Sequence, residues 1–224
     1  MFRIKICGIT HRPDAFVAMA LGADAIGLNF VERSRRYLPP SLAGNVAAAI
    51  PTGVAKVGVF VNSPAEEVGR MSDRLQLDFV QLSGDEPAEY LATLPGRLVI
   101  KTFRFGPNGL KPLDQLLKAA GKLNCLPSQI LIDADRPGQF GGTGATVDWA
   151  RLRHELDLSD FTDLPLVLAG GLTPENVGEA IDTVDPDAVD VASGVEYSPG
   201  RKDADRVNRF IAAATAAFDR MRRT

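Results

Sequence analysis

The sequence has few of the residues that cross-link small folds or bind metal ions. Its 224 residues include two cysteines, Cys7 and Cys125, two histidines and one tryptophan. Two distant cysteines match neither a disulfide framework nor a zinc site, so we expect a reducing cytoplasm and no metal. No run approaches the roughly eighteen apolar residues of a membrane span, and the first residues resemble a strand instead of a signal peptide. We therefore expect neither membrane insertion nor secretion.

An excess of charge of one sign is also missing. Lys and Arg number 25 against 28 Asp and Glu, which gives a formal net charge of -3. A nucleic-acid surface normally concentrates basic residues, and the cluster Arg33, Arg35 and Arg36 is too short to form one. We therefore expect a small-molecule partner, with no nucleic acid and no membrane. Because the sequence establishes no exposed apolar stripe, we expect a monomer, with a homodimer as the alternative.

What is present is a regular alternation of short β-rich runs and longer amphipathic stretches. The predicted strands are 3–7, 25–30, 55–60, 79–82, 98–103, 130–133, 166–169 and 188–192. The predicted helices are 12–21, 41–50, 64–75, 87–94, 110–120, 147–156, 174–183 and 203–221. Ser63 and Thr173, each followed by proline, are predicted to cap two of these helices. Such alternation is typical of βα units around a parallel sheet.

Eight rounds favour an α/β fold of the (β/α)₈ type, a TIM barrel, with residues 1–224 as a single domain. A Rossmann or flavodoxin-like sheet would typically have five or six strands and a phosphate loop after the first strand. Here the glycine-rich turns follow the sixth, seventh and eighth strands. Barrels commonly bind phosphate with the loops near the last two strands, so the late turns favour the barrel.

The active site of a barrel lies where the C-terminal ends of the strands meet. Cys7 ends the first predicted strand, Arg36 follows the second, Asp133 ends the sixth and Asp190 lies in the eighth. We therefore expect these four residues to converge. From the residues alone, however, Cys7 is more ordinarily a small buried hydrophobe. Asp133 could also be a helix cap or surface ion pair, a role that Asp135 would fill equally well.

Glycine-rich turns are candidates for phosphate binding. Without a Cβ the backbone approaches an anion closely, and helix N-termini present unpaired N–H groups. Three such turns occur, at 141–144, 169–171 and 192–195. One turn alone would more often be only a turn, but two adjacent late ones in a barrel favour a phosphate site. The residues selected in these turns are Gly142, Gly170, Gly171, Ser193 and Gly194.

Several segments, in order along nearly the whole chain, resemble those of the phosphoribosylanthranilate isomerases. They are KICGIT at 5–10, GLNFVERSRRYL at 27–38, GVFVN at 58–62, VQLSG at 80–84, LIDAD at 131–135, GGTG at 141–144, LAGGLTPENV at 168–177 and DVASGVE at 190–196. The resemblance implies a TIM-barrel isomerase of tryptophan biosynthesis. Its reaction is the Amadori rearrangement of N-(5-phosphoribosyl)anthranilate to 1-(o-carboxyphenylamino)-1-deoxyribulose 5-phosphate, without metal or organic cofactor.

The resemblance also implies roles for the strand-end residues. Asp133 would be the general acid that protonates the ring oxygen, and Cys7 the base that removes a proton from the second sugar carbon. A thiolate is available when nearby cations lower its pKa, and Arg36 could be such a cation. Arg36 would also hold the anthranilate carboxylate. Asp190 would bind a substrate hydroxyl or orient the site. An equally weighted alternative is that Asp190 only makes a buried structural hydrogen bond.

Two departures from the family pattern qualify these roles. The family's usual Ser-Pro-Arg is Ser34-Arg35-Arg36 here, so Arg35 is a rival for the carboxylate, although the spacing from Phe30 aligns Arg36. Ser83 stands where the family usually carries histidine.

Other phosphate-binding barrels are alternatives. An indole-glycerol-phosphate synthase should have catalytic lysine and glutamate at strand ends, and a ribulose-phosphate epimerase a metal-binding histidine set; neither pattern is evident. A barrel that binds a phosphosugar but has lost catalysis is the alternative from another class. The presence of both proton-handling candidates argues against it.

Overall fold

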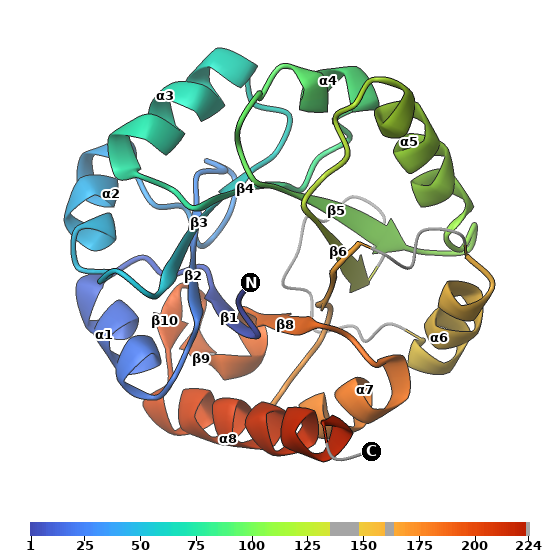
Figure 1. Ribbon diagram of the computed structural model, residues 1–224. Coiled ribbons are helices and arrows are strands. Elements are labelled where there is room, and N and C mark those ends of the chain that lie inside the picture. Colours follow the sequence, from blue (N-terminus) through green and yellow to red (C-terminus); the bar gives the residue numbers. More distant parts are fainter. Residues whose placement is uncertain (135–147, 160–163, 223–224) are drawn as a thin grey trace.

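Eight parallel strands close into a barrel in the order of the sequence. The computed structural model describes residues 1–134, 148–159 and 164–222. Each strand pairs with the next, and β8 returns to pair with β1 (Figure 1). The strands are β1 Ile4–Cys7, β2 Ala25–Asn29, β3 Ala55–Phe60, β4 Phe79–Leu82, β5 Val99–Phe105, β6 Gln129–Ala134, β7 Leu166–Leu168 and β8 Ala188–Val191. This closure confirms the predicted TIM barrel.

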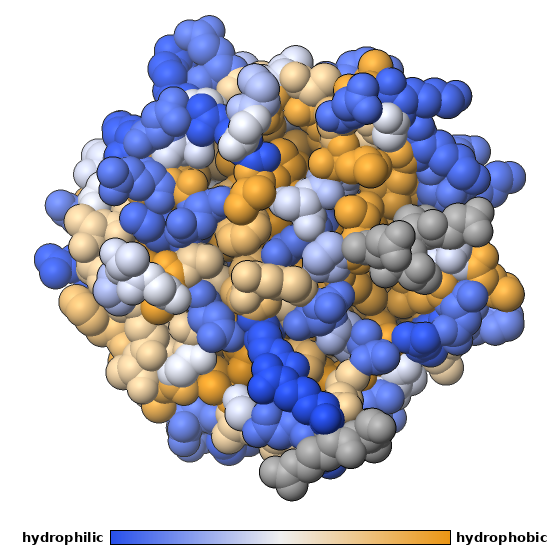
Figure 2. Space-filling view, viewed as in Figure 1, coloured by the Kyte–Doolittle hydropathy of each residue, from blue (hydrophilic) through white to orange (hydrophobic). Residues whose placement is uncertain are grey.

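The helices form a ring outside the strands (Figure 1). They are α1 Arg12–Ala20, α2 Pro40–Ala47, α3 Ala65–Leu75, α4 Ala88–Ala92, α5 Lys111–Lys122, α6 Trp149–Asp157, α7 Val177–Val184 and α8 Ala204–Met221. Figure 2 shows mostly hydrophilic side chains around the outer edge of the face in view. Hydrophobic side chains are more frequent nearer the middle of that face. Within the described ranges, no helix is long and apolar enough to cross a membrane.

Both predicted hydroxyl caps are wrong. Helix α3 begins at Ala65 with Pro64 at its N-cap, and no side chain caps it. Helix α7 begins only at Val177, because the residues before it form a turn in which the Thr173 hydroxyl accepts from the Glu175 amide at 3.2 Å. The Thr173 hydroxyl therefore stabilises a turn at the barrel mouth instead of a helix end.

A short insertion between β8 and α8 was not predicted. It consists of a 3₁₀ turn, η1 (Ser193–Val195), and an antiparallel hairpin of β9 (Glu196–Ser198) and β10 (Arg201–Lys202). The available sequence signal was Pro199-Gly200, since Gly200 has a φ of +77° and such pairs mark turns. The hairpin lies next to β1 in Figure 1, and its residues Glu196, Tyr197 and Ser198 line the mouth of the barrel.

The interior of the barrel is closed below the mouth by a small apolar cluster. It is built from Phe2, Ala25, Val57, Ile100, Leu131, Val167, Ala169 and Ala188. Side chains alternate along each strand, so β1 places Ile4 and Ile6 in the larger core under the helices. The same alternation turns Lys5 and Cys7 inward. The inward side chains at the C-terminal strand ends therefore stand on an apolar floor.

Candidate active site

One cavity of about 730 Å³ occupies the mouth of the barrel. The predicted site residues that line this cavity are Cys7, Arg36, Asp133, Gly170, Gly171, Asp190 and Ser193. These come from β1, β6, β8 and the loops after β2, β7 and β8. The structure thus brings together most of the residues selected from sequence. Gly142 and the rival acid Asp135 lie outside the described residues.

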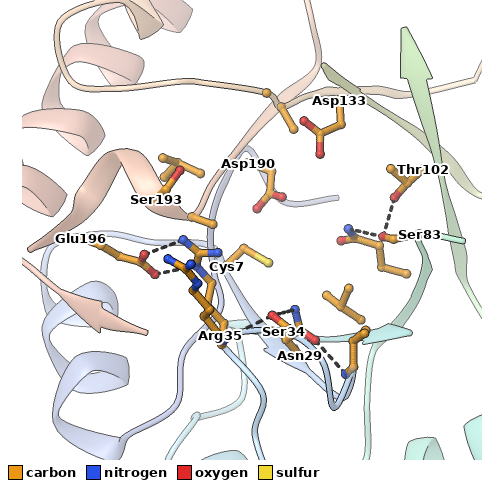
Figure 3. Close-up of a pocket in the computed structure, with 18 of the residues that line it drawn as sticks. Cys7, Asn29, Ser34, Arg35, Ser83, Thr102, Asp133, Asp190, Ser193 and Glu196 are labelled. Carbon is orange, nitrogen blue, oxygen red and sulfur yellow. Dashed lines mark hydrogen bonds and ion pairs between the residues drawn. The ribbon is translucent and has the colours of Figure 1, made fainter. Parts of the chain in front are cut away.

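The two residues predicted to handle protons face the same space. In Figure 3 the side chains of Cys7, Asp133 and Asp190 point into the middle of the cavity. Asp133 is half-buried on β6, in register with Arg104 of β5. Gly27 of β2 lies beside Cys7, and a Cβ there would be 2.6 Å from the Cys7 sulfur. The absence of a side chain at Gly27 therefore leaves space for the Cys7 thiol.

Lys5 lies beside Asp190 and acts on Cys7, and sequence analysis did not single it out. Its side chain is fully buried, its Nζ donates to Asp190 Oδ1 at 2.8 Å, and its charge acts on the Cys7 thiol. Burial raises the pKa of the Cys7 thiol and the Asp190 carboxylate raises it further, whereas Lys5 and Lys202 oppose both. The expectation that nearby cations lower this pKa is therefore wrong in its net direction, because burial and an acidic neighbour outweigh them.

Arg36 is held by a carboxylate that sequence analysis did not select. Its Nε donates to Glu196 Oε1 at 2.8 Å and its Nη2 to Glu196 Oε2 at 2.7 Å. Lys202 donates to the same carboxylate at 2.9 Å and to the Cys7 carbonyl at 2.6 Å. Although burial alone would raise it, Arg36 and Lys202 hold the pKa of Glu196 below its ordinary value. Glu196 is therefore an anion fixed between two cations at the wall of the cavity.

This ion pair leaves part of the Arg36 guanidinium for a ligand. A guanidinium carries five N–H donors, and Glu196 uses one edge, Nε with Nη2. The other edge, Nη1 with the second N–H of Nη2, has the shape that receives a carboxylate. Arg35 is exposed and also lines the cavity, so the structure keeps both arginines at the mouth.

The loops after β7 and β8 meet closely at one end of the cavity. Gly170 and Gly171 have φ values of +86° and +66°. A Cβ on Gly194 would lie 1.9 Å from the Leu172 carbonyl oxygen, so only glycine permits this approach. Ser193 begins the 3₁₀ turn η1, and the first amides of such a turn have no partner within it. Ser193 lines the cavity, whereas Gly194 is not one of the described lining residues and contributes through its close contact with Leu172.

The opposite side of the cavity carries a chain of neutral polar groups. Gln81 Nε2 donates to Ser83 Oγ at 3.1 Å, and Ser83 Oγ shares a hydrogen bond of 2.9 Å with Thr102 Oγ1. Figure 3 shows Ser83 and Thr102 across the cavity from Glu196. Ser83 thus replaces the family's usual histidine with a hydroxyl that bonds to its neighbours. The missed signal was Gln81 itself, a polar residue inside the apolar run 79–82.

A buried lysine–glutamate pair, which was not evident from the sequence, joins β5 to the loop that follows β4. Lys101 Nζ donates to Glu86 Oε2 at 2.7 Å and to the Gly84 carbonyl at 2.8 Å. Glu86 in turn accepts from the amides of Asn62 and Gly84. These contacts join the loop after β4 to β5 through Lys101 and to the loop after β3 through Asn62, so the pair has a structural role.

Comparison with known proteins agrees with the fold. The family model described as N-(5'-phosphoribosyl)anthranilate (PRA) isomerase matches residues 4–213. The isomerase of Geobacter metallireducens is 44% identical over 217 residues, which cover 96% of this chain and 100% of that protein.

Two solved structures extend the comparison. A phosphoribosyl anthranilate isomerase in complex with reduced 1-(o-carboxyphenylamino)-1-deoxyribulose 5-phosphate is 37% identical, with a TM-score of 0.81 over 96% of this chain and 100% of that one. A structure of monomers of the dimeric isomerase from Thermotoga maritima is also 37% identical, with a TM-score of 0.77 and the same coverage. The chain therefore belongs to the N-(5'-phosphoribosyl)anthranilate isomerase family, whose enzymes serve tryptophan biosynthesis.

Proposed function

We propose that this cavity carries out the Amadori rearrangement of N-(5-phosphoribosyl)anthranilate by general acid–base catalysis, with Asp133 as the acid and Cys7 as the base. The observation that carries the proposal is that β1 and β6, far apart in sequence, turn these two side chains into one cavity. The reaction needs one group that gives a proton and one that takes a proton, and a carboxyl and a thiolate are suited to those tasks.

The first step opens the sugar ring. Asp133 gives its proton to the ring oxygen while the bond from the first sugar carbon to that oxygen breaks. The lone pair of the anthranilate nitrogen forms a carbon–nitrogen double bond, so the product is a protonated Schiff base. Asp133 is left as a carboxylate.

The second step forms an enolamine. The Cys7 thiolate takes the proton from the second sugar carbon, and the electron pair moves to the bond between the first and second carbons and on to nitrogen. Tautomerisation returns a proton to the first carbon and leaves a ketone at the second. The raised pKa of Cys7 makes the thiolate scarcer at neutral pH but also a stronger base for a carbon-bound proton.

Lys5 and Asp190 are proposed to position and tune this base. The positive charge of the Lys5 ammonium favours the Cys7 thiolate and lowers its pKa, whereas the Asp190 charge raises that pKa. Asp190 also lines the cavity, which keeps it available to a sugar hydroxyl. The ion pair of Asp190 with Lys5 is therefore compatible with a role for Asp190 in binding the substrate.

The two charged ends of the substrate are proposed to bind at two separate places on the cavity wall. Arg36 would receive the anthranilate carboxylate on the guanidinium edge that Glu196 leaves, and Glu196 holds that guanidinium in place. The amides of Gly170, Gly171 and Ser193 would receive the phosphate, as in other barrels that bind phosphate beside the last two strands.

The experiment that tests this proposal is a coupled assay with freshly generated N-(5-phosphoribosyl)anthranilate. Turnover by the wild-type protein and its loss in Cys7→Ser and Asp133→Asn would support the assignment. Binding without turnover by the wild-type protein would instead favour a phosphosugar-binding barrel that has lost catalysis. The monomer, with the homodimer as alternative, and the cytoplasmic location remain separate proposals; light scattering of the purified protein tests the first.

A further inference from the structure

Gln81 has a buried acceptor atom without a hydrogen-bond partner, on a side chain that lines the cavity. Its side chain belongs to β4, is only 4% exposed and lines the cavity. In the described part of the chain, three buried polar side-chain atoms lack a hydrogen bond: Gln81 Oε1, Gln129 Oε1 and Trp149 Nε1. Of these three residues, Gln81 is the one among the cavity-lining side chains. An unmade hydrogen bond at a buried site is costly, so such an atom indicates a missing partner.

The structure places the Gln81 amide in one orientation. Nε2 donates to Ser83, and Ser83 is bonded to Thr102 of β5, so the amide nitrogen is engaged on the side of β5. In this orientation Oε1 is the amide atom left for a ligand. The reversed amide would present Nε2 instead, and the two orientations predict opposite ligand chemistry, acceptor or donor.

We propose that Gln81 Oε1 accepts a hydrogen bond from an N–H or O–H group of the substrate and thereby helps to select the aminosugar. This inference rests on the function proposed above. The carboxylate and phosphate of the substrate are acceptors, so they cannot partner Oε1. Its available donors are the amine that joins the aromatic ring to the sugar and the sugar hydroxyls.

The position of β4 in the barrel supports this choice. It lies four strands from β8, on the opposite side from the loops proposed to hold phosphate. A substrate held by its phosphate beside β7 and β8 and by its carboxylate at Arg36 leaves its sugar and amine in the cavity between these contacts, toward the β4 side. Gln81 is therefore placed to contact the sugar or the linking amine of the substrate.

The test compares Gln81→Leu with a matched control, Gln129→Leu. Gln129 is also buried, at 3% exposure, and its Oε1 also lacks a partner among the described residues, but it lies at the start of β6, the end away from the mouth. We expect Gln81→Leu to weaken calorimetric binding of reduced 1-(o-carboxyphenylamino)-1-deoxyribulose 5-phosphate by about tenfold, near the upper end for one neutral hydrogen bond. Gln129→Leu should stay within about twofold of wild type on the same basis.

Two further arms identify the contacted group. If Gln81 accepts from a sugar hydroxyl, Gln81→Leu also weakens binding of ribulose 5-phosphate, which has no amine. If it accepts from the amine, only the reduced product analogue loses affinity. Either result supports the acceptor role. Gln81→Glu keeps the acceptor and should bind the analogue more tightly than Gln81→Leu does.

Two results would overturn the inference. One is unchanged affinity and KM in Gln81→Leu with the fold intact by thermal midpoint. The other is weaker binding by Gln81→Glu than by Gln81→Leu, because the amide would then be a donor to an acceptor of the ligand. Failure of the proposed function is distinguishable, since it would appear as wild-type protein that binds the analogue but does not turn over substrate.

Discussion

One edge of the Arg36 guanidinium donates to both carboxylate oxygens of Glu196, from Nε to Oε1 at 2.8 Å and from Nη2 to Oε2 at 2.7 Å. The pair joins the loop after β2 to the hairpin after β8, across the site of the base. Arg36 is therefore rigid before any ligand arrives, and a rigid donor loses little freedom when it binds a carboxylate. The exposed side chain of Arg35 lacks this support.

The first prediction concerns these two arginines. Arg36→Ala should lower kcat/KM by about 10- to 100-fold, the range of a charge-assisted hydrogen bond, whereas Arg35→Ala should change it by about threefold or less. Steady-state kinetics of both variants check this. The reverse order would assign the carboxylate contact to Arg35.

The second prediction concerns Glu196 and stability. Glu196→Ala leaves two buried cations, Arg36 and Lys202, without their anion, and removal of one partner from a buried pair typically costs about 3–5 kcal/mol. We expect chemical denaturation to show a loss of this size. An unchanged free energy of unfolding would mean that solvent replaces the carboxylate.

The same carboxylate should contribute to acid unfolding. The folded-state pKa of Glu196 is lowered from 4.5, so its stabilisation is present above that value and is lost as the pH falls through the folded pKa. Stability curves measured downward from pH 5 should therefore fall less steeply in Glu196→Gln than in the wild-type protein. Parallel curves would contradict this.

The third prediction concerns the pH dependence of Cys7. Because Asp190 raises its pKa and Lys5 lowers it, Asp190→Asn should move the rising limb of kcat/KM to lower pH and Lys5→Met to higher pH. Alkylation of Cys7 by iodoacetamide as a function of pH gives an independent measure. It requires a Cys125→Ser background, since Cys125 is half-buried. Shifts in the same direction for both variants would contradict the opposed charges.

The fourth prediction concerns the acid and the base. Cys7→Ser and Asp133→Asn should each lower kcat by about 10²–10⁴-fold, the usual value of one general acid or base. Both side chains lie at strand ends beside the cavity, so we expect the free energy of unfolding to change by about 1 kcal/mol or less. Near-normal turnover in Asp133→Asn would redirect attention to Asp135 or Asp190, and a collapsed thermal midpoint would show a structural role.

The fifth prediction concerns the phosphate end. Crystals grown in sulfate should hold an anion near Gly171 and Ser193, and Gly194→Ala should raise KM, because its Cβ would push against the Leu172 carbonyl. Gly44→Ala is a matched control, since a Cβ there meets nothing within 4 Å. An anion bound elsewhere with this end empty would count against the assignment.

Much of the barrel could be predicted from sequence because strand and helix periods are local properties of the chain. Seven of the eight helices begin within two residues of the predicted positions, and α7 is the exception because Thr173 and Asn176 bond within a turn. The identity of Cys7, Asp133 and Asp190 as mouth residues also followed from sequence, because a parallel barrel places all C-terminal strand ends on one face.

Only the tertiary structure decided which groups these residues meet. Lys5 and Asp190 are 185 residues apart, and Arg36 and Glu196 are 160 apart, so no local pattern links them. Barrel closure pairs β1 with β8 and sets Asp190 of β8 beside Lys5 of β1. The Asp190 carboxylate, together with burial, raises the Cys7 pKa, which is opposite to the expected direction. The sequence by itself determined the order of the strands and several of the residues that line the mouth. Their charges and hydrogen bonds depend on distances that only the closed barrel creates.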